Sequence, residues 1–355
     1  MSSIVPTIDL APWFRGSRDH MALDHVALDH VATELDAACR RVGFFEVVGH
    51  GVPATIIEAM TRETERFFAL PADVKQQYTP SVPEVNRGYA ARCAEGLAYS
   101  VGVSRPADLF EAFNIGPDVV DLSVPAVAAE RDRLFAPNLW PVEVPLLRAA
   151  LVGYMASARL VADTLMDVFA AALGLPDRSL RHFTTHSTDT LRVNHYETQP
   201  GDPDPEPGQL GMGEHTDYGM CTVLFADAVP GLQIIGPDGR WHDVMPSPGA
   251  LLVNLGDLMA QWTNDRWQST LHRVLPPRRD RTAVTSRRSV AFFHDGNHDA
   301  LIECLPTCAS PDNPARYAPV VAGQHLMAKL MGPRLHTASV AADTTGGRLA
   351  GAAEG

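Results

Sequence analysis

The fold depends on the stretch Gly213-Glu214-His215-Thr216-Asp217-Tyr218-Gly219, together with the later stretch Ser269-Thr270-Leu271-His272-Arg273. On an extended strand, residues two apart project from the same face, so His215 and Asp217 can bind one ion together. His272 would join them from a neighbouring strand of an antiparallel barrel. Two histidines and one carboxylate are the ligands of non-haem Fe(II) sites that keep positions open. Taken alone, a His-x-Asp pair is weak evidence, and a turn or a surface hydrogen bond is the better interpretation of it.

Two further stretches, one before and one after this region, show the alternation of polar and apolar residues that is typical of strands. The later stretch places Arg287 and Ser289 on one face of a strand, and the earlier one places Asn194 and Tyr196 together. A guanidinium offers a rigid fork for a carboxylate, and a hydroxyl adds a second donor. The pattern therefore predicts a carboxylate-binding group beside the metal.

With these residues in place, the sequence resembles the 2-oxoglutarate and Fe(II)-dependent dioxygenases of the isopenicillin N synthase-like family. The likeness runs over nearly the whole chain, up to about residue 335. It implies Fe(II) on His215, Asp217 and His272. It implies four residues around 2-oxoglutarate, which are Asn194, Tyr196, Arg287 and Ser289. The implied fold class is α+β with a mainly β core, a double-stranded β-helix (jelly roll) braced by helices, with an N-terminal α/β cap.

The resemblance also implies a division of the chain into five segments. Residues 1–120 form the cap region, and residues 121–185 hold a connecting loop and a long bracing helix. The Fe(II)/2-oxoglutarate barrel covers residues 186–300, followed by a closing segment over 301–337. Residues 338–355 are Ala, Gly, Thr and Ser with few large apolar side chains, so we expect a disordered tail.

Apolar residues recur at helical spacing in three segments of the first half. The predicted helices cover residues 20–41, 54–68 and 146–173, with a strand over 44–48. The third helix is the most hydrophobic run of the chain, but charged residues interrupt it at helical spacing. It predicts a helix with one buried face and not a membrane span. Between residues 117 and 145, Pro, Ala and Asp predict a long connecting loop.

From Thr190 onward the periodicity changes to two, and turn signals recur between short apolar runs, as in a barrel or jelly roll. Strands are predicted over residues 222–225, 232–235, 241–244 and 251–255. The run Gly236-Pro237-Asp238-Gly239 predicts a hairpin turn between the second and third of these strands.

Other histidines compete with the three predicted ligands. His242 has no partner at ligand spacing, and His294 and His298 flank a polar Asp-Gly-Asn turn that makes a helical zinc pair unfavourable. His50 lies in a Gly-His-Gly turn, where a structural role is the simpler interpretation. We rank His215 above His242, His294 and His298.

Three residues are candidate substrate contacts. Arg87 and Tyr89 belong to a turn and strand that flank the substrate in the family that the chain resembles. A turn arginine is more often a solvated charge, which is the alternative for Arg87. Leu326 belongs to a C-terminal helix that in relatives lies over the mouth of the barrel.

Composition and charge limit the partners. A hydrophobic content of 45% suffices for a sizeable core. The net charge of −13 argues against nucleic acid and anionic membranes as partners, because those need clustered Lys and Arg. The five cysteines form no CxxC pair and the N-terminus shows no signal peptide. We expect a cytoplasmic protein, a monomer or weak homo-oligomer, that acts on a small-molecule substrate.

The implied reaction uses 2-oxoglutarate and O2 as co-substrates on Fe(II) and releases succinate and CO2. Hydroxylation of the substrate is the usual outcome, with desaturation and ring closure as variants. One alternative is a 2-oxoglutarate-independent oxidase resembling isopenicillin N synthase, in which Arg287 and Ser289 would hold the carboxylate of the substrate itself. Tyr196 favours 2-oxoglutarate. A non-enzyme alternative is a barrel that binds a metal or ligand without turnover.

Overall fold

The computed structural model describes residues 4–18, 25–280 and 282–337. The first half of the chain alternates short strands with helices. Its elements are β1 (Thr7–Asp9), α1 (Ala11–Arg18), α2 (His25–Arg41), β2 (Phe44–Val48), α3 (Ala54–Phe68), α4 (Ala72–Gln76), β3 (Gly88–Ala90), the 3-10 helix η1 (Leu97–Val101), β4 (Glu111–Ile115), α5 (Pro125–Ala129), α6 (Leu147–Ala172) and η2 (Arg181–Thr184).

The second half is mostly strands. Its elements are β5 (Thr190–Thr198), β6 (Met212–His215), β7 (Cys221–Ala226), β8 (Leu232–Ile235), β9 (Trp241–Asp243), β10 (Leu251–Leu255), α7 (Asp257–Trp262), β11 (His272–Val274), β12 (Thr285–His294), β13 (Leu301–Ile302), η3 (Pro306–Cys308), β14 (Val320–Val321) and α8 (Ala322–Leu335).

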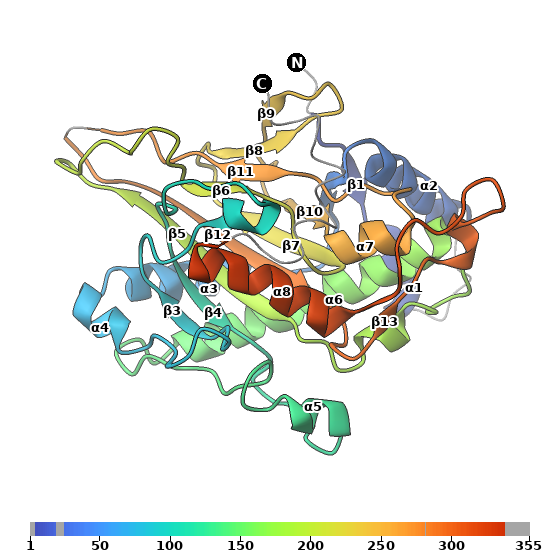
Figure 1. The fold of residues 1–355 in the computed structure, drawn as a ribbon, viewed down its shortest axis with the longest axis horizontal. Coiled ribbons are helices and arrows are strands. Elements are labelled where there is room, and N and C mark those ends of the chain that lie inside the picture. The colour runs from blue at the N-terminus through green and yellow to red at the C-terminus, as the bar shows by residue number, and fades with distance from the viewer. Residues whose placement is uncertain (1–3, 19–24, 281, 338–355) are drawn as a thin grey trace.

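Two sheets form the jelly roll. The larger has eight strands in the order β1-β2-β10-β7-β12-β5-β4-β3, and the smaller has four in the order β6-β11-β8-β9. Strands β1 to β4 of the N-terminal region pair at the two edges of the larger sheet, through β2 with β10 and β4 with β5. The N-terminal region is therefore continuous with the barrel sheet. Helix α8, red in Figure 1, crosses in front of the strands.

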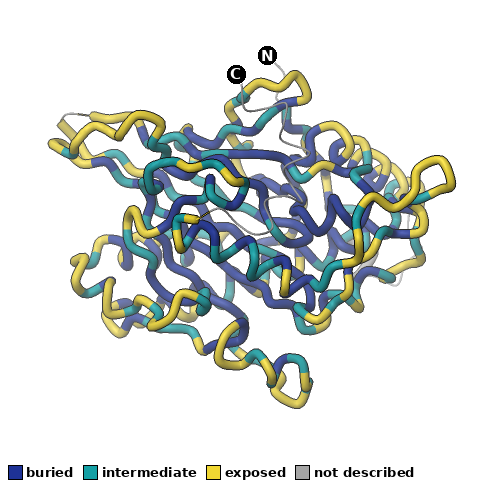
Figure 2. Tube along the Cα trace, viewed as in Figure 1, coloured by how far each residue is buried: buried dark blue, intermediate teal, exposed yellow. Residues whose placement is uncertain are grey.

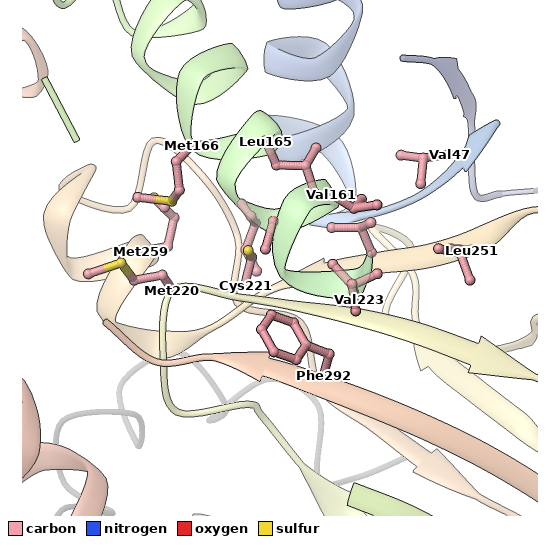
Figure 3. Packing of buried hydrophobic residues seen from close by; sticks show 14 of the residues in the cluster. Val47, Val161, Leu165, Met166, Met220, Cys221, Val223, Leu251, Met259 and Phe292 are labelled. Carbon is pink, nitrogen blue, oxygen red and sulfur yellow. The ribbon is translucent and has the colours of Figure 1, made fainter. Parts of the chain in front are cut away.

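Helix α6 covers the outer face of the larger sheet. Figure 3 shows its Val161 and Leu165 directed at Cys221, Val223 and Phe292 of the sheet, all buried. Figure 2 shows the same pattern over the whole molecule, with buried chain at the centre and exposed chain in the peripheral loops. Among the described residues, no helix is both long and apolar enough to span a membrane.

The inner face of the larger sheet meets the smaller sheet. Because side chains on a strand alternate between faces, each central strand sends every second residue inward. Tyr196 and Leu252 of the larger sheet pack there with Met212, Leu232 and Val274 of the smaller one. The polar inward residues of the same strands have no place in this apolar cluster, and they line a cavity between the sheets.

Most element predictions are confirmed. Strand β2 and helix α3 have the predicted bounds, and α6 is one residue shorter at each end. The predicted hairpin joins β8 and β9, which pair antiparallel. Residues 20–24 of the first predicted helix and the predicted tail over 338–355 lie outside the described residues.

Two elements correct the sequence prediction. The stretch predicted as a connecting loop contains the short helix α5, which begins at Pro125, a residue whose fixed φ suits the first helical turn. Helix α7 was not predicted at all. All six of its residues are buried, so the helix shows no alternation of apolar and polar faces that a sequence pattern would reveal.

Candidate metal centre

The three predicted metal ligands meet at one point. His215 ends β6, His272 begins β11, and the two residues are direct partners in the antiparallel pair. With Asp217 they form the only group in the described part of the chain whose ligand atoms can hold a metal ion, all lying within 4.8 Å of one another. All three residues of the triad are buried.

Both histidines are held in the form that a metal needs. Nδ1 of His215 lies 2.8 Å from the carbonyl oxygen of Gly213, and Nδ1 of His272 lies 3.0 Å from that of Thr270. A carbonyl oxygen only accepts, so each Nδ1 carries the proton and each Nε2 is left with a lone pair. Burial, with the neighbouring imidazole of His272, lowers the pKa of His215 well below its ordinary value, which keeps the ring neutral.

The carboxylate of Asp217 is oriented by two donors. Nδ2 of Asn254 donates to its Oδ2 over 2.6 Å, and the Thr222 hydroxyl donates to the same oxygen. Thr222 and Asn254 face each other across β7 and β10. The other oxygen, Oδ1, is turned to the histidines and lies 3.9 Å and 3.7 Å from their Nε2 atoms. This set of donors fits Fe(II) or a similar divalent ion.

An open cavity lies beside the triad, with about 1010 Å³ of space between atoms when the solvent at its mouth is counted. The predicted co-substrate residues line it in two cross-strand pairs, Arg287 opposite Tyr196 and Ser289 opposite Asn194, on β12 and β5. All four side chains are buried. The register of one strand pair therefore brings together two sequence motifs that are almost a hundred residues apart.

Arg287 is a buried cation that forms no ion pair with another described residue, although Asp227 lies near enough to feel its charge. Its Nε and Nη1 have no hydrogen-bond partner within the described chain, and its Cζ lies 5.3 Å from the centre of the Tyr196 ring. A buried unpaired charge is costly, and a carboxylate fits a guanidinium with two parallel hydrogen bonds. Burial raises the pKa of Tyr196 to about 12, so its hydroxyl remains a donor. These residues fit one end of a dicarboxylate.

The candidate substrate contacts divide into one that reaches the cavity and two that do not. Leu326 of α8 lines it. The guanidinium of Arg87 donates to the carbonyl oxygens of Asn86, Leu134 and Ala136 and lines a small neighbouring hollow, so its contact with a substrate stays a prediction. The hydroxyl of Tyr89 donates to Glu111, and Tyr89 is not among the residues that line the cavity.

The competing histidines have other partners. His294 is buried against Asp189, with Nδ1 3.0 Å from Oδ1, and His242 contacts Asp238 within its hairpin. His50 contacts the carbonyl oxygen of Gly249. None of these histidines, nor His298, belongs to the metal-ligand group found among the described residues.

Several cavity residues were not found by sequence reasoning. Arg192 lies on the same face of β5 as Asn194 and Tyr196. Its spacing of two residues from Asn194 could have predicted this. Asn254 is the single polar residue of β10 and was a second signal. Glu95 precedes η1 and Arg334 lies near the end of α8. The family resemblance placed the C-terminal helix of Arg334 over the mouth of the barrel, whereas no local pattern indicates that the segment of Glu95 folds over the cavity.

Known proteins share both the sequence and the fold. Residues 187–296 match the family model of the 2OG-Fe(II) oxygenase superfamily, and residues 5–143 match that of the non-haem dioxygenase in morphine synthesis N-terminal family. The 2-oxoglutarate-Fe(II) type oxidoreductase hxnY of Emericella nidulans is 33% identical over 80% of this chain and 79% of its own.

Two further relatives are similar over more of the chain. The validamycin A dioxygenase of Streptomyces hygroscopicus subsp. limoneus is 32% identical over 93% of this chain and 86% of its own. The crystal structure of Neurospora crassa T7H with alpha-KG and thymine has a TM-score of 0.77 at 27% identity, covering 92% of this chain and 96% of that one.

Proposed function

Because the chain belongs to the 2-oxoglutarate–Fe(II) oxygenase superfamily and is a 2-oxoglutarate-dependent dioxygenase, we propose the roles of its site residues. His215, Asp217 and His272 hold Fe(II). Arg287, Ser289 and Tyr196 hold the far carboxylate of 2-oxoglutarate, with Asn194 beside them. The observation that carries this proposal is the buried Arg287 guanidinium, whose Nε and Nη1 have no partner among the described residues. The far carboxylate of 2-oxoglutarate would accept hydrogen bonds from these two nitrogens and neutralise the guanidinium charge.

The protein contributes binding, orientation and exclusion of water. Iron, when bound, supplies the activation of O2 that couples conversion of 2-oxoglutarate into succinate and CO2 to oxidation of a small-molecule substrate. Backbone carbonyls fix the ring tautomers of His215 and His272, while Asn254 and Thr222 aim Asp217. Buried apolar side chains around these groups keep bulk water away, so the reaction stays on the substrate.

Relatives differ in what they act on. Their names and complexes include validamycin A and thymine, which share no obvious framework. We propose for this chain a small-molecule substrate that enters beside the triad, with Leu326 as one contact. The five-segment division of the chain stays part of the proposal, as do a monomeric or weakly associating state, a cytoplasmic location and the absence of nucleic-acid and membrane partners. The net charge of −13 favours the last point.

The test is an anaerobic titration of the Fe(II)-loaded protein with 2-oxoglutarate, followed by the visible charge-transfer band of the complex. The band is expected in the unaltered protein and is expected to weaken strongly in Arg287→Ala. Arg288→Ala is the matched control, because Arg288 points to the opposite face of β12 and donates to the carbonyl oxygen of Thr61. A band of equal strength in both variants, or no band with iron bound, contradicts the assignment of Arg287.

A further inference from the structure

A second charged cluster lies in the cavity wall. It is centred on Arg192, two residues before Asn194 on β5. Arg192 of β5 and Arg334 of α8 both face Glu95, with Arg192 Nη2 2.7 Å from Oε2 and Arg334 Nε 3.9 Å from Oε1. The side chains of Arg192 and Arg334 are only 10% exposed and that of Glu95 is 9% exposed. Two guanidinium groups therefore share one carboxylate in a buried place.

This cluster carries an excess of positive charge. Burial alone would raise the pKa of Glu95, but Arg192 and Arg334 lower it overall, so Glu95 is charged. Burial lowers the pKa of Arg334, Glu95 partly offsets this, and Arg192 lowers it again. Glu84 also raises the pKa of Arg334, as the smallest of the causes that act on it.

The guanidinium groups of Arg192 and Arg334 have more N–H groups than their hydrogen bonds within the described residues use. Hydrogen bonds among the described residues take Nε of Arg192 to Asn194 and its two terminal nitrogens to Glu95. Arg334 donates to the carbonyl oxygen of Pro83 and, over 2.5 Å, to Oδ1 of Asn86. A guanidinium has five N–H groups, so both arginines retain N–H groups for a ligand.

The cavity lining around this cluster is mixed. Its apolar members include Leu97, Phe293, Leu326, Leu330 and Pro333, and its polar members include Asn86 and Thr190. A ligand bound to the two arginines therefore has apolar side chains in the same cavity for a hydrocarbon part. The same cavity is lined by the triad, by Arg287 and by this cluster, so a ligand here and 2-oxoglutarate would share one space.

We propose that the substrate is an apolar small molecule bearing a carboxylate, which binds Arg192 and Arg334 while its hydrocarbon part lies against the apolar side chains of the cavity toward the triad. This inference rests on the proposed function, because it places the substrate in the same cavity as 2-oxoglutarate. Arg192 and Arg334 are then residues that determine specificity, distinct from the co-substrate clamp at Arg287.

A cationic substrate is the opposite possibility, since Glu95 also lines the cavity. Both oxygens of Glu95 are already engaged by Arg192, at 3.5 Å and 2.7 Å. An ammonium group placed there would face two guanidinium charges for one carboxylate. The charge balance therefore favours an anion.

The test uses paired probes in the anaerobic Fe(II)–2-oxoglutarate complex, with binding measured by isothermal titration calorimetry. The probes are phenylacetate, 3-phenylpropionate and 4-phenylbutyrate, each compared with its own primary amide. Because hydrogen bonds to charged groups are stronger than neutral ones, at least one acid is expected to bind about tenfold or more tightly than its amide. Arg334→Gln is expected to abolish this preference.

The control is Arg131→Gln, because Arg131 is exposed and pairs with Asp132 away from the cavity. It is expected to keep the preference for the acids. Acids and amides that bind alike, acids that do not bind at all, or a preference that survives in Arg334→Gln would each overturn the inference. If Arg334→Gln does not fold, Arg334→Lys takes its place and is compared with the unaltered protein. The lysine variant is expected to keep a preference for acids over amides, but a weaker one.

The two proposals fail in different ways. Absence of the 2-oxoglutarate band in the unaltered protein contradicts the proposed function. A normal band without any preference for acids over amides overturns only the assignment of Arg192 and Arg334.

Discussion

Nδ2 of Asn254 donates to Oδ2 of Asp217 over 2.6 Å, and so turns the other carboxylate oxygen toward His215 and His272. Partners that orient a metal ligand are typically worth about tenfold to a hundredfold in metal affinity. Asn254→Ala is therefore expected to weaken Fe(II) binding by about that factor, measured by anaerobic titration calorimetry. Asn313→Ala, on an exposed turn, is the control. Equal affinities in the two variants would contradict the role of Asn254.

The helix α8 is expected to control the space available to substrate. Leu326 lines the cavity, whereas Leu335 on the same helix is exposed. Leu326→Trp adds a large ring to the cavity, so binding of 3-phenylpropionate should weaken by about tenfold or more. The 2-oxoglutarate band should persist, because the clamp lies on β5 and β12. The same substitution at Leu335 should change neither, and weakening in both variants would point to a disturbed helix.

The packing of α6 on the larger sheet predicts a stability effect. Phe292 is fully buried in that core, next to Val223 in Figure 3. Phe292→Ala removes a ring that its neighbours cannot replace, so the free energy of unfolding should fall by about 3–5 kcal/mol in urea denaturation. Val284→Ala, just before the same strand, removes an exposed side chain and should have little effect. A loss for Phe292→Ala no larger than for Val284→Ala would be inconsistent with this packing.

A buried carboxyl near the triad predicts a pH dependence of stability. Asp108 accepts hydrogen bonds from the backbone N–H groups of Leu97 and Gly213 at 2.7 Å and 2.8 Å. Burial nevertheless raises its pKa from 3.8 to about 7. Between these values the folded chain holds a proton that the unfolded chain has released, so stability from this group is lost as the pH rises through this window.

Asp108→Asn imitates the protonated acid at every pH. The unfolding free energy of the unaltered protein minus that of Asp108→Asn should therefore decline between about pH 5 and pH 7, by at most ~1.4 kcal/mol per pH unit. Urea denaturation across this range measures it. A difference that stays constant with pH would show that Asp108 is ionised in the folded protein throughout.

Strand periodicity explains why so much of the site was predictable. His215 with Asp217, Arg287 with Ser289, and Asn194 with Tyr196 are all pairs two residues apart, and alternation alone places each pair on one face. The strands themselves were identifiable because their other face is apolar. The cross-strand register that brings the pairs together followed from the family resemblance.

The remaining features depend on long-range folding. Glu95 reaches the cavity only because a loop folds over it. The place of the C-terminal helix was expected from the family resemblance, but not that its Arg334 would meet Glu95 there. Arg87 was a reasonable substrate contact by sequence, but its donors meet backbone carbonyls of a distant segment, and no local pattern encodes that arrangement. Contacts of this kind form between segments whose sequences show no shared periodicity.

Strand β5 has a consequence for which carbon is oxidised. Tyr196, at the proposed co-substrate site, and Arg192, at the proposed site for the substrate carboxylate, lie on one face four residues apart, about 13 Å along an extended strand. If both proposals hold, the strand fixes the distance between the two carboxylates. In a series of acids of increasing length, the oxidised carbon would then lie at a constant reach from the carboxylate, so positional selectivity would be measured from the acid end of the molecule and not from its tail.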